Sequence, residues 1–345
     1  MTAAAAIVQR PWPAALREGL QELRLLLDEQ RDVVIFGHKD ADGDTLGCSL
    51  AFAEGLRRQG HRAWVVIPPP HPALYEWVPG FADLLEQPPD GVEGGVALFL
   101  DASNVERAVK QAAHLVDRAA VVNIDHHESN TRFGTLNLVD PEAAAVGQMC
   151  LQLFDELGWP ITPTMATCLY AAILTDTGGF RHGNTNASVL GDAARLCALG
   201  ADPADIAGRI YSSRPLSTMR LQSHSLASMQ VEAEGRIAWA RVTKQMLHQT
   251  GSVMAESEGI IDSLNSISGL WVAIVFKEVS ASLVKISVRT RHDVDAAAIC
   301  AEFGGGGHRR AAGAELPGPM REAIDAVLGA ATQAIEHASG RSQYR

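Results

Sequence analysis

The chain has 345 residues, too many for one ordinary hydrophobic core, and this length predicts two domains of roughly 100 to 200 residues each. Its 29 Lys and Arg residues against 40 Asp and Glu give a formal net charge of −11, which opposes long-range attraction of a long nucleic acid. Five scattered cysteines, no basic leader and no apolar run long enough to cross a bilayer predict a soluble, cytoplasmic protein with reduced thiols.

Four short apolar runs in the first half predict buried strands, at residues 32–37, 62–67, 96–101 and 120–125. Stretches 46–60 and 104–119 between them have the composition and spacing of helices. This alternation predicts an α/β domain with a mainly parallel sheet flanked by helices. In such a sheet the ligand crevice lies beyond the carboxyl ends of the strands.

The rest of the chain changes character at residues 214–232, which are expected to form a connecting helix or linker. Residues 141–213 before it are mainly helical in pattern, so the first domain is expected to span residues 1–213. Residues 233–345 are expected to form a smaller α/β domain across a cleft. Its predicted elements are hairpin-like strands at 236–242, 271–279 and 282–290, helices at 294–303 and 320–338, and a loop at 304–313.

Four acidic motifs lie at the ends of these elements: "GHKDADGD" from Gly37, "DAS" from Asp101, "DHH" from Asp125 and "TDTGGF", which contains Asp176. Each motif alone is typical of a loop, a cap or a turn. Together, at one edge of a parallel sheet, their carboxylates would repel one another strongly unless divalent cations were bound. Carboxylate and imidazole ligands without thiolates favour Mn²⁺ or a similar ion. A pair of such ions is suited to attack on phosphorus.

The segment "FGGGGHRRAAG", from Phe303 to Gly313, is the second strong signal. Four glycines in a row permit close approach of the backbone to a ligand and expose N–H groups. His308, Arg309 and Arg310 add donors, and Arg289 lies in the preceding strand. The pattern favours anion binding over the alternative of a flexible turn with a basic edge.

The motifs "GHKDADGDTLG", "DAS", "IDHH", "TDTGGF" and "FGGGGHRRAAG", in this order, resemble those of the DHH/DHHA1 phosphoesterases over nearly the whole chain. The two-domain length is most similar to the NrnA-like branch, the nano-RNase and pAp phosphatase type. Two departures, Ala41 for proline and Cys48 for serine, do not affect a ligand. A third is larger: the family often reads D-P-x-A-S-S-T-G-E where this chain has "DPEAAAVGQ" at 140–148, which removes hydroxyls and an acid that could contact substrate.

The resemblance implies two Mn²⁺ ions, with Mg²⁺ or Co²⁺ as substitutes, and a catalytic group of Asp101, Asp125 and His127. Asp101 would bridge the ions, Asp125 would orient His126, and His127 would stabilise charge or protonate the leaving oxygen. One ion would be held by His38, Asp42 and Asp101, and the other by Asp44, Asp101, His126 and Asp176. The far end of the substrate would be bound by Arg289, Gly305, Gly306, Gly307, His308 and Arg309.

The implied activity is Mn²⁺-dependent hydrolysis of very short oligonucleotides (nano-RNA) and removal of phosphate from pAp-type nucleotides. One alternative with the same chemistry is a phosphodiesterase for c-di-AMP or pApA, and one from another class is a non-catalytic nucleotide sensor. A RecJ-like exonuclease is disfavoured by the length and charge, and a family II pyrophosphatase by the glycine motif. The expected partners are short RNA or DNA oligonucleotides and small nucleotides, with no long duplex and no membrane; a homodimer is compatible with the sequence.

Overall fold

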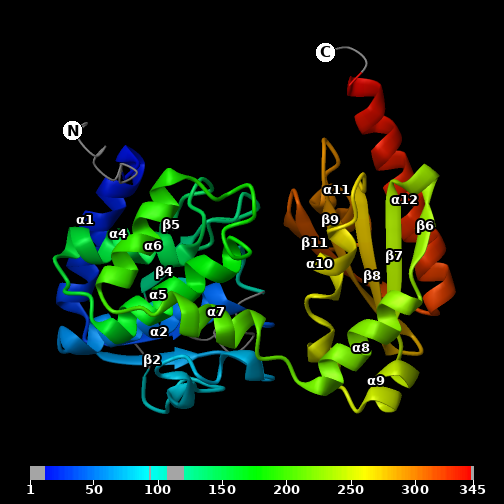
Figure 1. Cartoon of the computed structure of the whole chain (residues 1–345). Helices are drawn as coiled ribbons and strands as arrows, with labels where there is room; N and C mark the ends of the chain where they lie inside the picture. The colour runs from blue at the N-terminus through cyan, green and yellow to red at the C-terminus, as the bar shows by residue number, and fades with distance from the viewer. Residues whose placement is uncertain (1–11, 93–94, 107–119, 343–345) are drawn as a thin grey trace, which may run out of the picture. The chain divides into compact units, whose positions relative to one another are not determined.

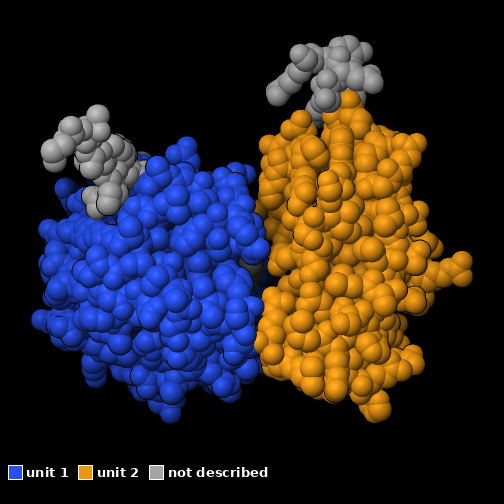
Figure 2. Space-filling view, in the orientation of Figure 1, with its two compact units in different colours: residues 1–213 blue, residues 214–345 orange. Residues whose placement is uncertain are grey.

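The computed structural model of the chain describes residues 12–92, 95–106 and 120–342. The chain divides into two compact units, residues 1–213 and 214–345, which Figure 2 colours separately. Most of the helix predicted over residues 104–119 falls outside the described residues. None of the helices within the described ranges combines the length and the apolar content that crossing a bilayer requires.

The first unit is built on a five-stranded sheet of order β2-β1-β3-β4-β5, in which every neighbouring pair is parallel (Figure 1). Four of these strands and the parallel arrangement confirm the predicted α/β class. β5 is not among the predicted strands, because "LNLV" is short and contains an Asn, which is depleted in strands. The strands are β1 (Asp32–Phe36), β2 (Arg62–Val66), β3 (Val96–Leu100), β4 (Ala120–Asp125) and β5 (Leu136–Val139).

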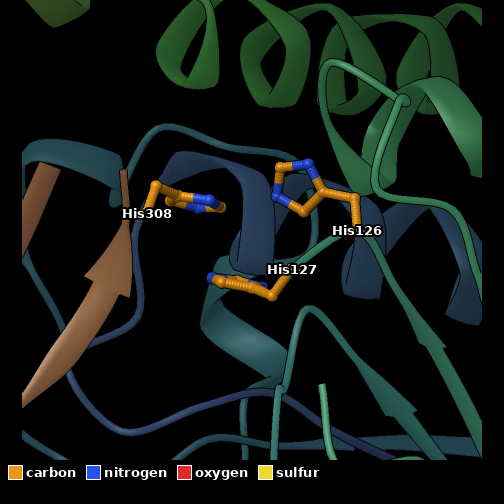
Figure 3. Close-up of side chains that lie close together, drawn as sticks. All are labelled: His126, His127 and His308. Carbon is orange, nitrogen blue, oxygen red and sulfur yellow. The ribbon is translucent and has the colours of Figure 1, made fainter. Parts of the chain in front are cut away.

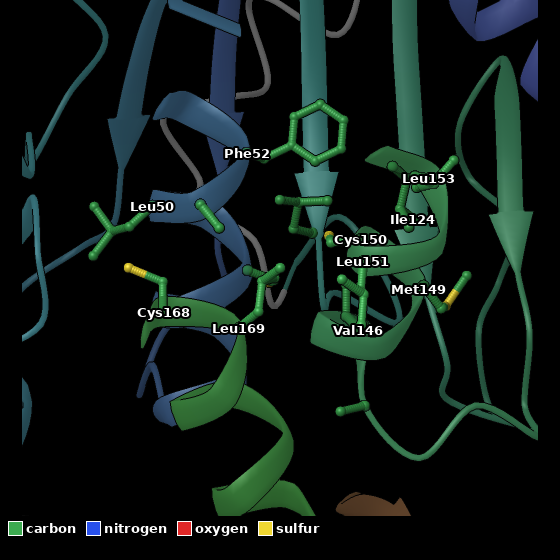
Figure 4. Close-up of a cluster of buried hydrophobic side chains, with 14 of the residues drawn as sticks. Leu50, Phe52, Ile124, Val146, Met149, Cys150, Leu151, Leu153, Cys168 and Leu169 are labelled. Atoms are coloured by element: carbon green, nitrogen blue, oxygen red, sulfur yellow. The ribbon is translucent and has the colours of Figure 1, made fainter. Parts of the chain in front are cut away.

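Successive residues of β1 point to opposite faces of this sheet, as the period of a strand requires. Val33 and Ile35 belong to the main core with the helices, whereas Val34 and Phe36 belong to a smaller cluster on the other face. In the main core, side chains of α2, α4 and α5 pack together with Ile124 of β4 (Figure 4). The helices are α1 (Ala14–Glu29), α2 (Gly43–Arg58), α4 (Val146–Leu157), α5 (Pro163–Asp176), α6 (Ala187–Ala198) and α7 (Pro203–Tyr211), with 3₁₀ turns η1 (Ala73–Tyr75) and η2 (Phe81–Asp83).

The second unit contains a six-stranded mixed sheet of order β10-β11-β9-β8-β7-β6. The predicted hairpin is present as β8 and β9, but β7 runs parallel to β8, because helical segments connect the two strands. The predicted loop at 304–313 is wrong: it contains β10 and the start of β11, which pair antiparallel. The strands are β6 (Gln230–Glu232), β7 (Ile237–Val242), β8 (Val272–Ser280), β9 (Leu283–Thr290), β10 (Gly306–His308) and β11 (Ala311–Pro317).

Two apolar clusters cover the two faces of this sheet. One contains Ile299 of α11 and Val327 of α12, and the other contains Leu221 of α8 and Leu264 of α10. The second sheet, with helices on both faces, therefore has its own core. The helical elements are α8 (Leu216–Ala227), α9 (Lys244–Thr250), α10 (Ile260–Asn265), α11 (Ala296–Ala301) and α12 (Met320–Ser342), with 3₁₀ turns η4 (Ala233–Gly235) and η5 (Met254–Ser257).

Candidate metal centre

Three strands and one helix of the first unit bring candidate ligands together. His38 follows β1, Asp101 follows β3, His126 and His127 follow β4, and Asp176 is the last residue of α5. Figure 3 shows the side chains of the two adjacent histidines after β4. Asp101 is 2% exposed and each of the three histidines is at most 6% exposed. The convergence that the order of the motifs predicts is therefore present in the structure.

The three acids of "DADGD" have three different positions. Asp40 has a φ of 60°, a left-handed conformation that Asp tolerates better than most residues. Asp42 caps α2, since one of its carboxylate oxygens accepts hydrogen bonds from the backbone N–H groups of Asp44 and Thr45, each 3.0 Å long. Asp44, in the first turn of α2, is 1% exposed. The motif therefore combines a turn, a helix cap and one buried carboxylate.

Asp101 is the residue around which the cluster is arranged. Its Oδ2 accepts a 2.6 Å hydrogen bond from Oγ1 of Thr45 and lies 3.4 Å from Nε2 of His38. Its Oδ1 lies 3.8 Å from Nε2 of His126 and 3.7 Å from Nδ1 of His127. The backbone of Asp101 has a φ of 58°, which is sterically costly for a residue with a Cβ and is found mostly where the surroundings enforce it.

The two histidines after β4 have different partners. His126 contacts the carbonyl oxygen of Ala143 through Nδ1 at 3.1 Å, and its Nε2 lies 3.5 Å from Oδ2 of Asp176. The expectation that Asp125 orients His126 is wrong. The carboxylate of Asp125 accepts a 2.7 Å hydrogen bond from Nδ1 of His127, so a backbone carbonyl orients His126 and the acid orients its neighbour.

Asn130, which the motif analysis does not single out, holds Asp125 in place. Its side-chain amide donates to the second oxygen of Asp125 at 2.6 Å and to the side-chain oxygen of Asn123 at 2.8 Å. The same amide lies 3.3 Å from the carbonyl oxygen of Ala102, next to Asp101. The only signal in the sequence is an Asn shortly after "DHH", which by itself is typical of a turn.

Asp44 is held by the start of α4, about 100 residues further along the chain. Its two carboxylate oxygens accept hydrogen bonds from the N–H groups of Val146, at 2.7 Å, and Gly147, at 2.8 Å. These are among the donors that a helix leaves unsatisfied at its N-terminus, and Ala145 at the cap position has no side-chain acceptor for them. Asp44 therefore caps α4 from a distance.

The acids and histidines strongly perturb one another's pKa values. Burial and the neighbouring Asp101 raise the pKa of Asp44 well above its usual value, and burial raises that of Asp176 to about 7. Burial disfavours the charged form of His126, but the carboxylates of Asp176, Asp44 and Asp101 outweigh it and raise its pKa to about 10. For Asp101, burial is likewise outweighed by a hydrogen bond and charge from His38, so its pKa is lowered.

These clusters of His and Asp, buried except at Asp42, fit a metal site. The ligand atoms of His38, Asp42 and Asp101 lie within 4.8 Å of one another, and so do those of Asp44, Asp101 and His126. The two groups share Asp101, and the buried carboxylates repel one another in the way that a bound cation relieves. Burial raises the pKa of Cys48 well above its usual value, so this nearby thiol stays protonated and the donors are nitrogen and oxygen.

The predicted substrate-binding residues of the second unit lie on or next to β9 and β10, the two strands that flank β11. Ala311 of β11 pairs with His308 of β10 on one side and with Arg289 of β9 on the other. Residues directly opposite in antiparallel strands share a face, so these three side chains lie on one face, with the small Ala311 in the middle. Arg309 follows β10 and lies 3.6 Å from the carboxylate of Asp293.

The glycines of this segment do not share one role. A Cβ at Gly305 would lie 2.2 Å from the carbonyl oxygen of Gly313, and one at Gly307 would lie 2.6 Å from that of Ala311. These two positions need glycine because β11 passes so close. A Cβ at Gly304 or Gly306 would have no atom within 4 Å, so these positions have room for a ligand beside the backbone.

A separate pocket of about 320 Å³ lies at the opposite edge of the first sheet, since Arg31 precedes β1 and His61 precedes β2. Its basic side chains lie near the C-terminal ends of helices, and the guanidinium of Arg24 donates to the carbonyl oxygen of Glu156 in the last turn of α4. Cations are favoured at helix C-termini, which accounts for these residues without a ligand. This pocket is not part of the metal centre.

Comparisons with known proteins agree with this architecture. The DHH family, N-terminal domain, matches residues 32–173, and the DHHA1 domain matches residues 239–337. A Thermus thermophilus protein named bifunctional oligoribonuclease and PAP phosphatase NrnA is 33% identical over 308 residues, which cover 89% of this chain and 91% of the relative. A Bacillus subtilis protein of the same name is 25% identical over 288 residues, covering 82% and 89%.

A solved structure agrees as well. The crystal structure of an exopolyphosphatase-related protein from Bacteroides fragilis matches with a TM-score of 0.83 and 25% identity, covering 93% of this chain and 96% of that one. One assignment follows from the two matched domains, from the acidic motifs and from the Thermus thermophilus relative, which matches along most of both chains. The chain belongs to the DHH/DHHA1 phosphoesterase family and is related to NrnA.

Proposed function

We propose that this phosphoesterase uses two divalent cations, with Mn²⁺ as the first candidate, to hydrolyse very short oligonucleotides to mononucleotides and to remove phosphate from pAp-type nucleotides. The observation that carries the proposal is Asp101, a buried carboxylate shared by two groups of ligand atoms at one edge of the sheet. The names of the two NrnA relatives supply the substrate class.

The proposed ligands are those of the sequence analysis. When bound, a pair of ions would polarise the phosphoryl oxygens and neutralise the charge that develops during attack. Because its pKa is lowered, Asp101 presents a full negative charge to both groups at neutral pH. One ion would be held by His38, Asp42 and Asp101, and the other by Asp44, Asp101, His126 and Asp176.

His127 is the proposed proton donor to the leaving oxygen. With Nδ1 donating to Asp125, Nε2 is the ring nitrogen that would hold and release the proton. Burial disfavours the charged form of Asp125, but the hydrogen bond from His127 outweighs it and lowers the pKa of the acid. An ionised Asp125 fixes the orientation of the ring and stabilises the protonated imidazole, as in other acid-histidine pairs.

The second unit would bind the end of the substrate that does not react. His308 and Arg289, on one face of the second sheet, are suited to a phosphate or a base, and the backbone at Gly306 has room for close approach. Gly305, Gly307 and Arg309 complete the proposed set. The formal charge of −11 is consistent with short substrates, since it disfavours a long polyanion that extends beyond the site.

A substrate panel tests the proposal. Purified protein with Mn²⁺ would be incubated with pApA, pAp, c-di-AMP and a long single-stranded RNA, and mononucleotide and phosphate release would be measured. We expect pApA and pAp to react fastest. Faster decay of the long RNA would contradict the nano-RNase activity, and preference for c-di-AMP would favour the cyclic dinucleotide alternative. Tight nucleotide binding without any turnover would identify a sensor.

A further inference from the structure

Residues 140–148, "DPEAAAVGQ", hold two proposed ligands through main-chain groups. The carbonyl oxygen of Ala143 contacts Nδ1 of His126, and the N–H groups of Val146 and Gly147 bind the carboxylate of Asp44. None of these contacts uses a side chain of the loop, so the missing hydroxyls leave them intact. The position of the loop backbone, by contrast, decides where both ligands lie.

The side chain of Gln148 connects this loop to α6. The side-chain oxygen of Gln148 accepts a 3.0 Å hydrogen bond from the N–H of Ala144, within the loop. The side-chain nitrogen donates to Oδ2 of Asp192 in α6 at 2.7 Å. A peptide N–H can only donate, so the oxygen of the amide must face Ala144 and its nitrogen must face Asp192.

Both members of this pair are buried, with Gln148 2% and Asp192 3% exposed. Burial raises the pKa of Asp192, while the hydrogen bond from Gln148 and the charge of Arg195 act in the opposite direction. A carboxylate in such surroundings needs a donor beside it. An amide supplies that donor, whereas the acid that the family often has at this position would place a second carboxylate oxygen against Asp192.

We propose that Gln148 is a positioning residue of the metal centre, which acts through the backbone of residues 143–147 and is matched in charge to Asp192. The proposal rests on the proposed function of the site, because it assigns the affected residues Asp44 and His126 to metal binding. It predicts that Gln148→Glu disturbs metal binding because two carboxylates cannot both stay ionised at hydrogen-bond distance. Restoring one amide to the pair should repair the defect.

The experiment measures Mn²⁺ affinity by isothermal titration calorimetry without substrate, together with unfolding temperature. We expect Gln148→Glu to lose about tenfold to 100-fold in affinity, the range typical of residues that orient metal ligands. The double variant Gln148→Glu with Asp192→Asn should return to within about threefold of wild type, since the new amide donates to the new carboxylate. Gln333→Glu, which adds the same charge on the exposed side of α12, serves as the control.

A smaller variant covers the case in which Gln148→Glu does not fold. Gln148→Ala removes the hydrogen bonds to Ala144 and Asp192, and a longer one to Ser188, without adding charge, and it should also weaken Mn²⁺ binding. Wild-type affinity in Gln148→Ala with a lowered unfolding temperature would show a purely structural role and overturn the proposal. So would a double variant no better than Gln148→Glu. If the wild type hydrolyses none of the panel but the affinity cycle behaves as expected, the proposed function fails and this inference stands.

Discussion

The two sets of proposed functional residues differ in how firmly the fold holds them. In the first unit the side chains of His38 and Asp101 are 5% and 3% exposed, and backbone groups or buried partners orient the ligands. In the second unit the side chains of Arg289 and Arg309 are 30% and 55% exposed. His38 and Asp101 are therefore fixed before a cation or substrate would arrive, whereas the proposed binding groups would lose rotamer freedom on binding. Substitutions in the first set should lower kcat and those in the second should raise KM.

The largest effect is expected from Asp101→Asn, which keeps the size of the side chain but removes the charge shared by both groups of ligands. Turnover of pApA should fall by more than about 1,000-fold, because both ions would lose a ligand. Circular dichroism should show an intact fold. Wild-type turnover in Asp101→Asn would contradict the bridging role. Asp325→Ala, on the exposed face of α12, is the control for loss of an acid.

His127→Ala should have the next largest effect, a loss of about 100-fold to 10,000-fold in kcat with little change in Mn²⁺ affinity, as expected for a proton donor. The measurement compares pApA with a nucleotide ester of p-nitrophenol, a leaving group that needs no proton. The loss should be much smaller with the p-nitrophenyl ester. An equal loss on both substrates would mean that His127 stabilises the phosphoryl group or a metal ion.

His308→Ala should act on the second set and raise KM for pApA about tenfold, with kcat and Mn²⁺ affinity little changed, because it removes one hydrogen bond to the substrate. Steady-state kinetics and calorimetry separate these quantities. His337→Ala, the same change on an exposed position of α12, is the matched control. A loss of Mn²⁺ affinity equal to the loss of substrate affinity would contradict the placement of His308 in the substrate site.

The smallest effect is on the stability of the metal-free protein at different pH values. The pKa of Asp176 is raised from 3.8 to about 7 and that of His126 from 6.5 to about 10. Both groups therefore stabilise the fold in their protonated forms, and this contribution is lost as pH rises through the folded values. Asp101 and Asp125, whose pKa values are lowered, are already ionised across this range and do not change.

Differential scanning fluorimetry in a chelating buffer should accordingly show the unfolding temperature falling from about pH 5 to about pH 9. Saturating Mn²⁺ should remove the fall, because the metal binds the deprotonated ligands. Asp176→Asn should flatten the slope of the metal-free protein. A metal-free unfolding temperature that rises steadily over this range would contradict the protonated state of the cluster.

The sequence predicts the convergence of the acids because parallel strands end at one edge, and the resemblance assigns the ligands from their order. It does not predict the contacts that orient those ligands. Asp44 and His126 are held by peptide groups of residues 143–147, and peptide groups are the same in every residue type. The wrong prediction for Asp125 has the same origin. The carbonyl oxygen of Ala143 already contacts His126, and Asp125 accepts its hydrogen bond from His127 instead.

The glycine segment was harder to predict for a different reason. A run of glycines has no side-chain pattern, so nothing in it distinguishes a loop from the β10–β11 hairpin that it forms. Only the neighbouring strand reveals why Gly305 and Gly307 lack a Cβ. Two of the four glycines in a motif that suggests ligand binding are therefore required by the close packing of β11.

The main-chain attachment of Asp44 to the start of α4 also determines which changes this part of the chain can accept during evolution. Replacement of Ala143, Ala144 or Ala145 by another small residue keeps every peptide group that the ligands use. Deletion or insertion of one residue there would rotate α4 by about 100° relative to the loop and move the N–H groups of Val146 and Gly147 away from the carboxylate. The loop can therefore diverge in residue type while its length stays constant.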